Sequence, residues 1–287
     1  MDRETRWLPP SAPEPAFPAP APAPSARPGA LKRIFGPLVV VGALLVNFGA
    51  KFKFILLLLP KLKILTTSGT MLVSIAAYSL IWGWKFAVGF VLLLLVHEMG
   101  HVIQLRREGI PASAPLFIPF LGAVVGAKSL GDNALAEARV GLAGPVLGTL
   151  GAAALVPVAL ATDSDFLRAL AFTGFFLNLF NLLPVLPLDG GRAMAALSPW
   201  MWFVGFGGLV ALTFVFPNPI MLLILLLGGM ETWRRLKLKR KGGEEQERFY
   251  QVKPRHRAMV AAVYVGLIVV LAAGMSATLV ERSLDSV

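Results

Sequence analysis

The sequence predicts an all-α polytopic membrane protein of about six to eight transmembrane helices, with a re-entrant or β-like segment near its functional site. Hydrophobic residues make up 56% of the 287 residues, and the mean hydropathy is +0.71. Both values exceed those of ordinary soluble domains. Several apolar runs have the roughly 17 to 25 residues that a helix needs to cross a bilayer.

The charge distribution supports the same fold class. The 27 Lys and Arg residues lie mostly in short clusters that flank the apolar runs. This distribution orients helices in membranes, so the net charge of +11 indicates a lipid bilayer and not nucleic acid as the partner. Cysteine is absent, which excludes disulfides and thiolate metal ligands.

The chain begins with a Pro/Ala-rich stretch at 1–30, which we expect to be a disordered tail. No apolar run directly follows a basic start, so no cleavable signal peptide is predicted. Residues 31–68 are expected to be a membrane-associated segment. Ile34–Ala50 is long enough for one span, whereas the following run FILLLLP is too short, so the number of N-terminal spans stays open.

A core at 69–230 follows, and its second helix carries the main motif. Gly69–Trp84 is expected to be the first core helix, with aromatic residues at its far end. Phe86–Arg107 starts as an apolar run and then, still at membrane depth, presents three titratable residues, His97, Glu98 and His101. Such side chains cost several kcal/mol inside a membrane, so they usually mark a functional site.

The motif HEMGH at 97–101 predicts a metal site. His97 and His101 are one helical turn apart, so both imidazoles project from one face and can hold a single zinc ion. Glu98 lies beside them, where it can accept a proton from water. A lone buried His is more often a hydrogen-bonded core residue, but two of the three His of this chain fall in the motif. We therefore predict one Zn²⁺ per chain.

The segment 109–128 is apolar but cannot be one helix. Its sequence GIPASAPLFIPFLGAVVGAK contains Pro111, Pro115 and Pro119, which interrupt helical hydrogen bonding. At membrane depth such backbone is tolerated only where it is buried in protein or lines a cavity. We expect a re-entrant or strand-like segment beside the site, whose edge can pair with an extended peptide. A plain hydrophobic loop is the alternative.

The remaining apolar runs are expected to form helices, at Val140–Ala161, Phe166–Leu183, Trp200–Phe216 and Ile220–Met230. A short polar loop is expected at 128–139, a basic cytoplasmic loop at 231–257, and a C-terminal transmembrane helix and tail at 258–287. If the basic loop is cytoplasmic, alternation of the helices places His97 and His101 in the cytoplasmic half of the bilayer. Lys85 and Arg168 are the exceptions to this charge bias.

The third metal ligand is expected to be Asp189. Two imidazoles leave a catalytic zinc one protein ligand short. Asp189 ends an apolar run between Pro187 and a Gly-Gly pair, where prolines break the helix and irregular backbone can bring the carboxylate to the metal. Glu108 is too near the motif, and Glu137 has no motif around it. The alternative interpretation of LDGG, at 188–191, is a turn that ends a helix, which by itself would explain these four residues.

HEMGH at 97–101 and NLLPVLPLDGG at 181–191 together resemble the site-2 protease family of intramembrane zinc metalloproteases, over Gly69 to about Met230. The resemblance implies that His97, His101 and Asp189 hold zinc and that Glu98 is the general base. It also implies that Asn181 positions the substrate or stabilises the reacting carbonyl. Asn178, about a turn earlier on the same face, is equally plausible as a packing hydrogen-bonder. Many relatives carry PDZ or CBS domains; we expect neither in this sequence, because residues 102–180 are too apolar and the C-terminal part is one basic loop and one helix.

The implied function is hydrolysis of peptide bonds within or near the transmembrane helix of a single-span membrane protein. The expected location is a bacterial plasma membrane, crossed several times, with the site towards the cytoplasm. A zinc-binding scaffold without activity and a metal transporter are the alternatives. Transporters tend to have repeated, inverted halves, and the chain has no second HExxH-like segment. The oligomeric state is left open.

Overall fold

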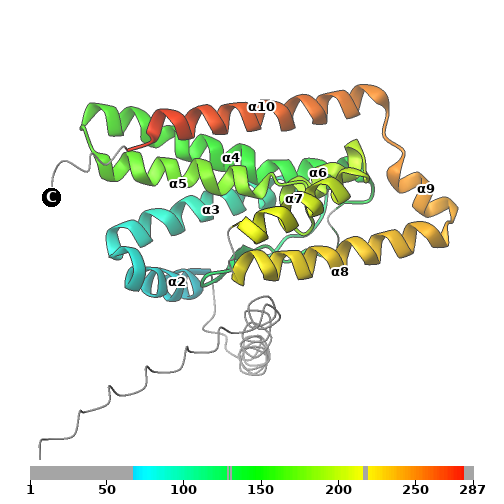
Figure 1. Cartoon of the computed structure of the whole chain (residues 1–287), viewed down its shortest axis with the longest axis horizontal. Coiled ribbons are helices and arrows are strands. Elements are labelled where there is room, and N and C mark those ends of the chain that lie inside the picture. The colour runs from blue at the N-terminus through cyan, green and yellow to red at the C-terminus, as the bar shows by residue number, and fades with distance from the viewer. Residues whose placement is uncertain (1–66, 128, 130, 216–218, 281–287) are drawn as a thin grey trace, which may run out of the picture. The chain divides into compact units, whose positions relative to one another are not determined.

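A computed structural model describes residues 67–127, 129, 131–215 and 219–280 (Figure 1). All of these residues belong to one compact unit. The expected tail at 1–30 lies outside the described residues, as does the expected membrane segment at 31–68 except for its last two positions.

The described part of the chain is mainly helical, which confirms the all-α part of the predicted class. Its elements are α2 (Thr67–Trp82), α3 (Trp84–Arg107), β1 (Leu116–Ile118), β2 (Gly122–Val124), α4 (Ala134–Ala161), α5 (Asp165–Asn181), α6 (Asp189–Leu197), α7 (Met201–Val215), α8 (Pro219–Lys241), α9 (Glu244–Tyr250) and α10 (Pro254–Thr278). Among these helices, α3, α4 and α10 are long and apolar enough to cross a membrane, and α2 and α7 are shorter apolar helices. The six to eight spans expected from the sequence are therefore not established by the described residues.

The helix that carries the motif is bounded by glycines. Gly83 has φ 79° between α2 and α3, and Gly109 has φ 76° just after α3. This left-handed backbone suits glycine, so the helix breaks at both places. Arg106 and Arg107 occupy the last turn of α3, where positive charge is favourable to the helix dipole.

Helix α4 is the centre of the packing. It contacts α3, α5, α6 and α10 (Figure 1). The contact with α3 is close because Gly100 faces the backbone of Ala143, and a Cβ on Gly100 would collide with the Ala143 carbonyl. Small residues that let helix backbones approach are typical of membrane helix pairs. This packing holds the motif helix directly against α4.

The described part of the predicted segment, residues 109–127, contains a short antiparallel hairpin, so the strand-like interpretation is confirmed. β1 and β2 pair through Leu116–Val124, Phe117–Ala123 and Ile118–Gly122, and an isolated bridge joins Ala112 to Ala127. The backbone N–H of Phe117 donates to Thr70 Oγ1 at 3.2 Å, and the N–H of Phe120 donates to Tyr78 Oη at 3.1 Å. The hairpin is thus anchored to α2.

Two expected loops are largely helical. Helix α8 continues to Lys241 and α9 follows, so most of 231–257 is helix and not loop. Glu231 pairs with Arg234 and Arg235, three and four residues later, and such pairs stabilise a helix. In the polar stretch 128–139, α4 already begins at Ala134, because the Asn133 side chain caps it by accepting the N–H of Ala136.

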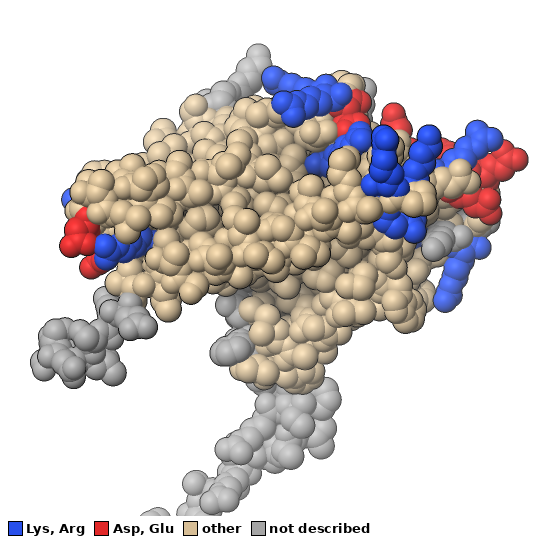
Figure 2. Space-filling view, turned by 90° about the horizontal axis from the view of Figure 1, so that it is seen from above, with Lys and Arg blue, Asp and Glu red and all other residues tan. Residues whose placement is uncertain are grey.

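The charged side chains are segregated. Figure 2 shows Lys, Arg, Asp and Glu towards two ends of this face of the molecule, with a broad uncharged middle between them. Arg168, an exception to the predicted charge bias, pairs with Asp163 and Asp165 in the acidic turn before α5. Because these two acids balance its positive charge, Arg168 is compatible with the predicted distribution of positive charge across the membrane.

Candidate metal centre

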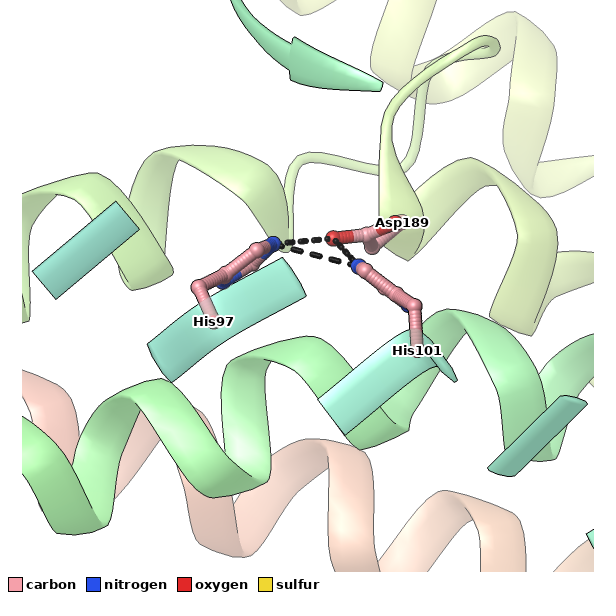
Figure 3. A group of neighbouring side chains, drawn as sticks. All are labelled: His97, His101 and Asp189. Carbon is pink, nitrogen blue, oxygen red and sulfur yellow. Dashed lines mark hydrogen bonds and ion pairs between the residues drawn. The ribbon is translucent and has the colours of Figure 1, made fainter. Parts of the chain in front are cut away.

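Helices α3 and α6 bring three predicted ligands together (Figure 3). His97 and His101 project from one face of α3, and Asp189 is the first residue of α6. Asp189 Oδ2 lies 3.2 Å from His97 Nε2 and 3.3 Å from His101 Nε2, and the two Nε2 atoms are 3.2 Å apart. All three residues are at most 5% exposed. Residues separated by about 90 positions in the sequence therefore form one buried cluster.

The hydrogen bonds behind the two rings determine which nitrogen faces the cluster. His101 Nδ1 lies 2.8 Å from the carbonyl oxygen of Val140, which can only accept, so this nitrogen carries the proton. His97 Nδ1 lies 2.8 Å from Asn178 Oδ1, which is also an acceptor. In the neutral rings both Nε2 atoms then present lone pairs.

This arrangement fits a zinc ion. Two imidazole lone pairs and a carboxylate oxygen converge without a donor between them, which is unfavourable unless a cation lies at their centre. Tetrahedral zinc, with bonds of about 2.0 to 2.1 Å, places its ligand atoms roughly 3.3 Å apart. The separations of 3.2 and 3.3 Å in the cluster match that spacing. The outer hydrogen bonds are also of the kind that orients metal-bound histidines.

Glycines make the room for these side chains. A Cβ on Gly144 of α4 would collide with the ring of His101, and a Cβ on Gly148 would collide with the amide of Asn178. A Cβ on Gly190 would meet the carbonyl of Leu182, and one on Gly191 would meet the backbone of Val185. The glycines of LDGG thus serve close packing of α6 on the preceding loop as well as the turn itself.

Glu98 belongs to the same buried region. It follows His97 on α3, and only 8% of its surface is exposed. Its carboxyl group is close enough to interact electrostatically with both histidines and Asp189. Glu98 is thus a second carboxyl group in this buried region, near the predicted ligands but not one of them.

The two asparagines of α5 have different surroundings. Asn178 is 2% exposed, and its amide accepts from His97 while its Nδ2 donates to the carbonyl of Gly174 at 2.7 Å. Asn181 is half-buried at the end of α5, and its Nδ2 donates to the carbonyl of Leu177 at 3.1 Å. Among the described residues, Asn178 is therefore the asparagine that contacts a predicted ligand.

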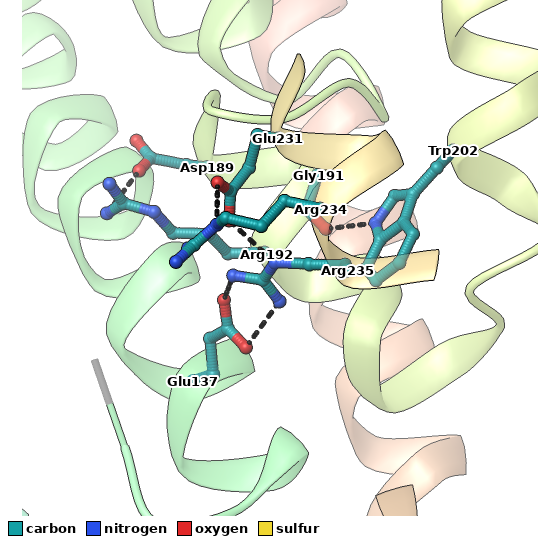
Figure 4. Close-up of polar contacts among 8 residues, drawn as sticks. All are labelled: Glu137, Asp189, Gly191, Arg192, Trp202, Glu231, Arg234 and Arg235. Carbon is teal, nitrogen blue, oxygen red and sulfur yellow. Dashed lines mark hydrogen bonds and ion pairs between the residues drawn. The ribbon is translucent and has the colours of Figure 1, made fainter. Parts of the chain in front are cut away.

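A polar network behind Asp189 was not predicted (Figure 4). Arg192 Nη1 lies 3.5 Å from Asp189 Oδ1, the oxygen that faces away from the histidines. The indole N–H of Trp202 donates to the carbonyl of Gly191 at 2.6 Å. The guanidinium of Arg235 lies over the Trp202 ring, 5.5 Å from its centroid. The first turn of α6 is thus connected through α7 to α8.

Two carboxylates hold Arg235 in this network. Glu137, which is 2% exposed, receives two hydrogen bonds from the guanidinium of Arg235, one of them at 2.9 Å. Both of its oxygens are engaged there, which accounts for this buried acid. Glu231 also binds Arg235. Burial alone would raise the pKa of Glu231, but hydrogen bonds from Arg234 and Arg235 outweigh it and lower the pKa, so Glu231 stays charged.

Comparisons with known proteins agree with the motifs. Residues 85–165 match the profile of Peptidase family M50, the site-2 protease family. The chain is 30% identical over 129 residues to a zinc metalloprotease of Methanocaldococcus jannaschii, covering 43% of this chain and 37% of that protein. It is 29% identical over 141 residues to Rip3 of Mycobacterium tuberculosis, named as a candidate zinc metalloprotease, covering 45% and 35%. The predicted resemblance is confirmed, although the chain spans only about a third of the length of these relatives.

Proposed function

We propose that this chain is an intramembrane zinc metalloprotease. The observation that carries the proposal is the convergence of His97 Nε2, His101 Nε2 and Asp189 Oδ2 at zinc-ligand spacing, with Glu98 buried beside them. Three protein ligands leave one position for water or substrate, as catalytic zinc sites require. The matches to a peptidase family and to proteins named zinc metalloproteases support the same function.

The chemistry divides between the metal and the protein. A zinc ion held by the three ligands would polarise water and the scissile carbonyl as a Lewis acid. Glu98 accepts the proton of the attacking water and can return it to the leaving amine. Asn178 keeps the His97 ring in its metal-binding tautomer through Nδ1. Asn181 is proposed to position the substrate or the reacting carbonyl, as the family resemblance implies.

The proposed substrate is the transmembrane helix of a single-span protein. A helix hides its carbonyls in its own hydrogen bonds, so it must unwind before hydrolysis. The hairpin β1–β2 supports a way to hold the unwound substrate, because β2 has β1 as its one strand neighbour among the described residues. We propose that its other edge pairs with an extended peptide, in the manner of strand addition.

The proposed setting is a multi-pass protein of a bacterial plasma membrane with six to eight transmembrane helices. The candidate spans α3, α4 and α10, together with the shorter apolar helices α2 and α7, support several crossings. The positive-inside tendency favours the basic end near α8 and α9 as the cytoplasmic end. In that orientation, water would reach the metal site from the cytoplasm.

Cleavage of a transmembrane reporter by the purified full chain in proteoliposomes tests this function. We expect wild-type protein to cleave the reporter and Glu98→Gln to lose activity by at least a hundredfold, because general-base catalysis contributes about 10² to 10⁴. Glu108→Gln, at an acid paired with Arg139 outside the metal cluster, is the matched control and should retain activity. Full activity in Glu98→Gln would refute the mechanism. Zinc without cleavage of any reporter would favour a scaffold.

A further inference from the structure

The three candidate membrane spans line an open groove that the proposed reaction does not use. Helices α3, α4 and α10 surround a volume of about 560 Å³. Its walls are mainly apolar, with contributions from Leu142, Val146 and Leu147 of α4 and from Val260 and Val263 of α10. Since these helices have the length and composition of membrane spans, we expect the groove to face lipid and not bulk water.

One end of the groove is polar and positively charged. Arg107, the last residue of α3, and Arg139, near the start of α4, both line it, together with Gln104. Arg255 lies in the first turn of α10, one turn before the groove residue Met259 and on the same helix face. All three helices therefore place an arginine at this end.

The charge at this end is only partly balanced. Glu108 Oε1 lies 3.6 Å from Arg139 Nη1 and accepts a hydrogen bond from Gln104 at 2.7 Å. Arg107 is exposed and has no ion-pair partner among the residues that the structure describes. The N-termini of α4 and α10 lie at the same end and add partial positive charge, which is partly offset by the partial negative charge at the C-terminus of α3.

We propose that this groove binds one phospholipid of the surrounding bilayer that carries an anionic headgroup. The phosphate lies against Arg107 and Arg139, and one acyl chain follows the apolar wall formed by α4 and α10. Basic pockets between membrane helices are suited to anionic headgroups. Free phosphate would leave the apolar part of the groove without a ligand.

The size of the groove favours an acyl chain over a peptide helix. A helix is about 10 Å across with its side chains, so a 20 Å length fills roughly 1,600 Å³. That is almost three times the 560 Å³ of this open groove, so a helix could lie only partly within it. An unbranched hydrocarbon chain is narrower and matches both the apolar lining and the single charged end. Gly100 and Ala143, where α3 packs on α4 beside His101, also line the groove, so the lipid would brace that packing.

Lipid retention by the full chain tests the proposal without reference to zinc or cleavage. The protein is reconstituted into nanodiscs with equal phosphatidylcholine and phosphatidylglycerol, re-extracted in mild detergent, and its retained lipid is measured by native mass spectrometry. We expect about one phosphatidylglycerol per wild-type chain. Arg107→Gln should lower its preference over phosphatidylcholine about fivefold, the contribution typical of one arginine. Arg106→Gln, the neighbouring arginine outside the groove lining, should leave it unchanged.

A second pair of variants tests the acyl-chain part. Val146→Trp fills the groove and should abolish retention, whereas Val158→Trp, at an exposed position of α4 outside the lining, should not. Retention that survives Val146→Trp, or equal effects of Arg106→Gln and Arg107→Gln, would overturn the proposal. Photocrosslinking from Val263 to a peptide, either a substrate helix or the chain's own segment 34–59, in place of lipid would also overturn it.

Discussion

At the scale of single residues, the asparagines show what a motif can and cannot predict. HEMGH predicts that two imidazoles share a helix face, because the i, i+4 spacing alone fixes that geometry. The partner of His97 Nδ1 is Asn178, 81 residues later in the chain. The family resemblance assigns a role to Asn181, but the sequence does not show which of the two amides faces His97, since both lie on the same helix. Only the packing of α5 against the motif helix makes the difference.

Asn178→Ala is expected to weaken zinc binding by about 10- to 100-fold, because it removes the outer hydrogen bond that orients His97. Asn181→Ala should change zinc affinity little, since its amide bonds to the backbone of its own helix. Competition with a fluorescent zinc chelator measures both affinities on purified protein. A larger loss of affinity in Asn181→Ala than in Asn178→Ala would contradict this assignment.

At the scale of elements, the apolar helices were predictable, whereas α6, α9 and the polar connections between helices were not. Apolar runs locate α3, α4 and α10 because membrane helices must satisfy their backbone internally. The region 231–257 looked like a loop because it is polar, yet the pairs of Glu231 with Arg234 and Arg235 stabilise a helix there. The link from this helix to Asp189 passes through Trp202 on α7, a contact that no spacing in the sequence indicates.

The link through Trp202 is expected to support Asp189. Trp202→Phe keeps the aromatic ring under Arg235 but leaves the carbonyl of Gly191 without its indole donor, so the first turn of α6 is held less firmly. We expect about tenfold weaker zinc binding, at the low end for outer contacts of a metal site. Trp200→Phe, at a 70% exposed residue, is the matched control. Equal zinc affinities of the two variants and wild type, by chelator competition, would show that the link has no such role.

At the scale of the whole described region, the charges are segregated and favour one orientation in a membrane. Helix α4 runs from the basic end, where it contacts α9, to the acidic turn that precedes α5. The sequence predicted this segregation because charged residues flank the apolar runs. The number of membrane crossings is harder to predict, since short apolar helices such as α2 and α7 have too few residues to decide by length.

Because the chain has no cysteine, single cysteines can report the orientation directly. Glu245→Cys on α9 and Thr162→Cys after α4 place exposed thiols at opposite ends of a candidate span. In intact bacterial cells we expect a membrane-impermeant maleimide to label Thr162→Cys, and to label Glu245→Cys only after lysis. The reverse pattern would place the basic end outside the cell, against the positive-inside tendency.

The metal centre itself is the central claim, and zinc content tests it most directly. Full-length wild type, Glu98→Gln and Asp189→Ala are purified in detergent without chelators, and zinc per chain is measured by mass spectrometry of the elements. We predict one zinc per chain in wild type and in Glu98→Gln, and loss of zinc in Asp189→Ala, because Asp189 Oδ2 contacts both His97 and His101. Wild-type protein without zinc, or Asp189→Ala that retains it with unchanged affinity, would contradict the site described here.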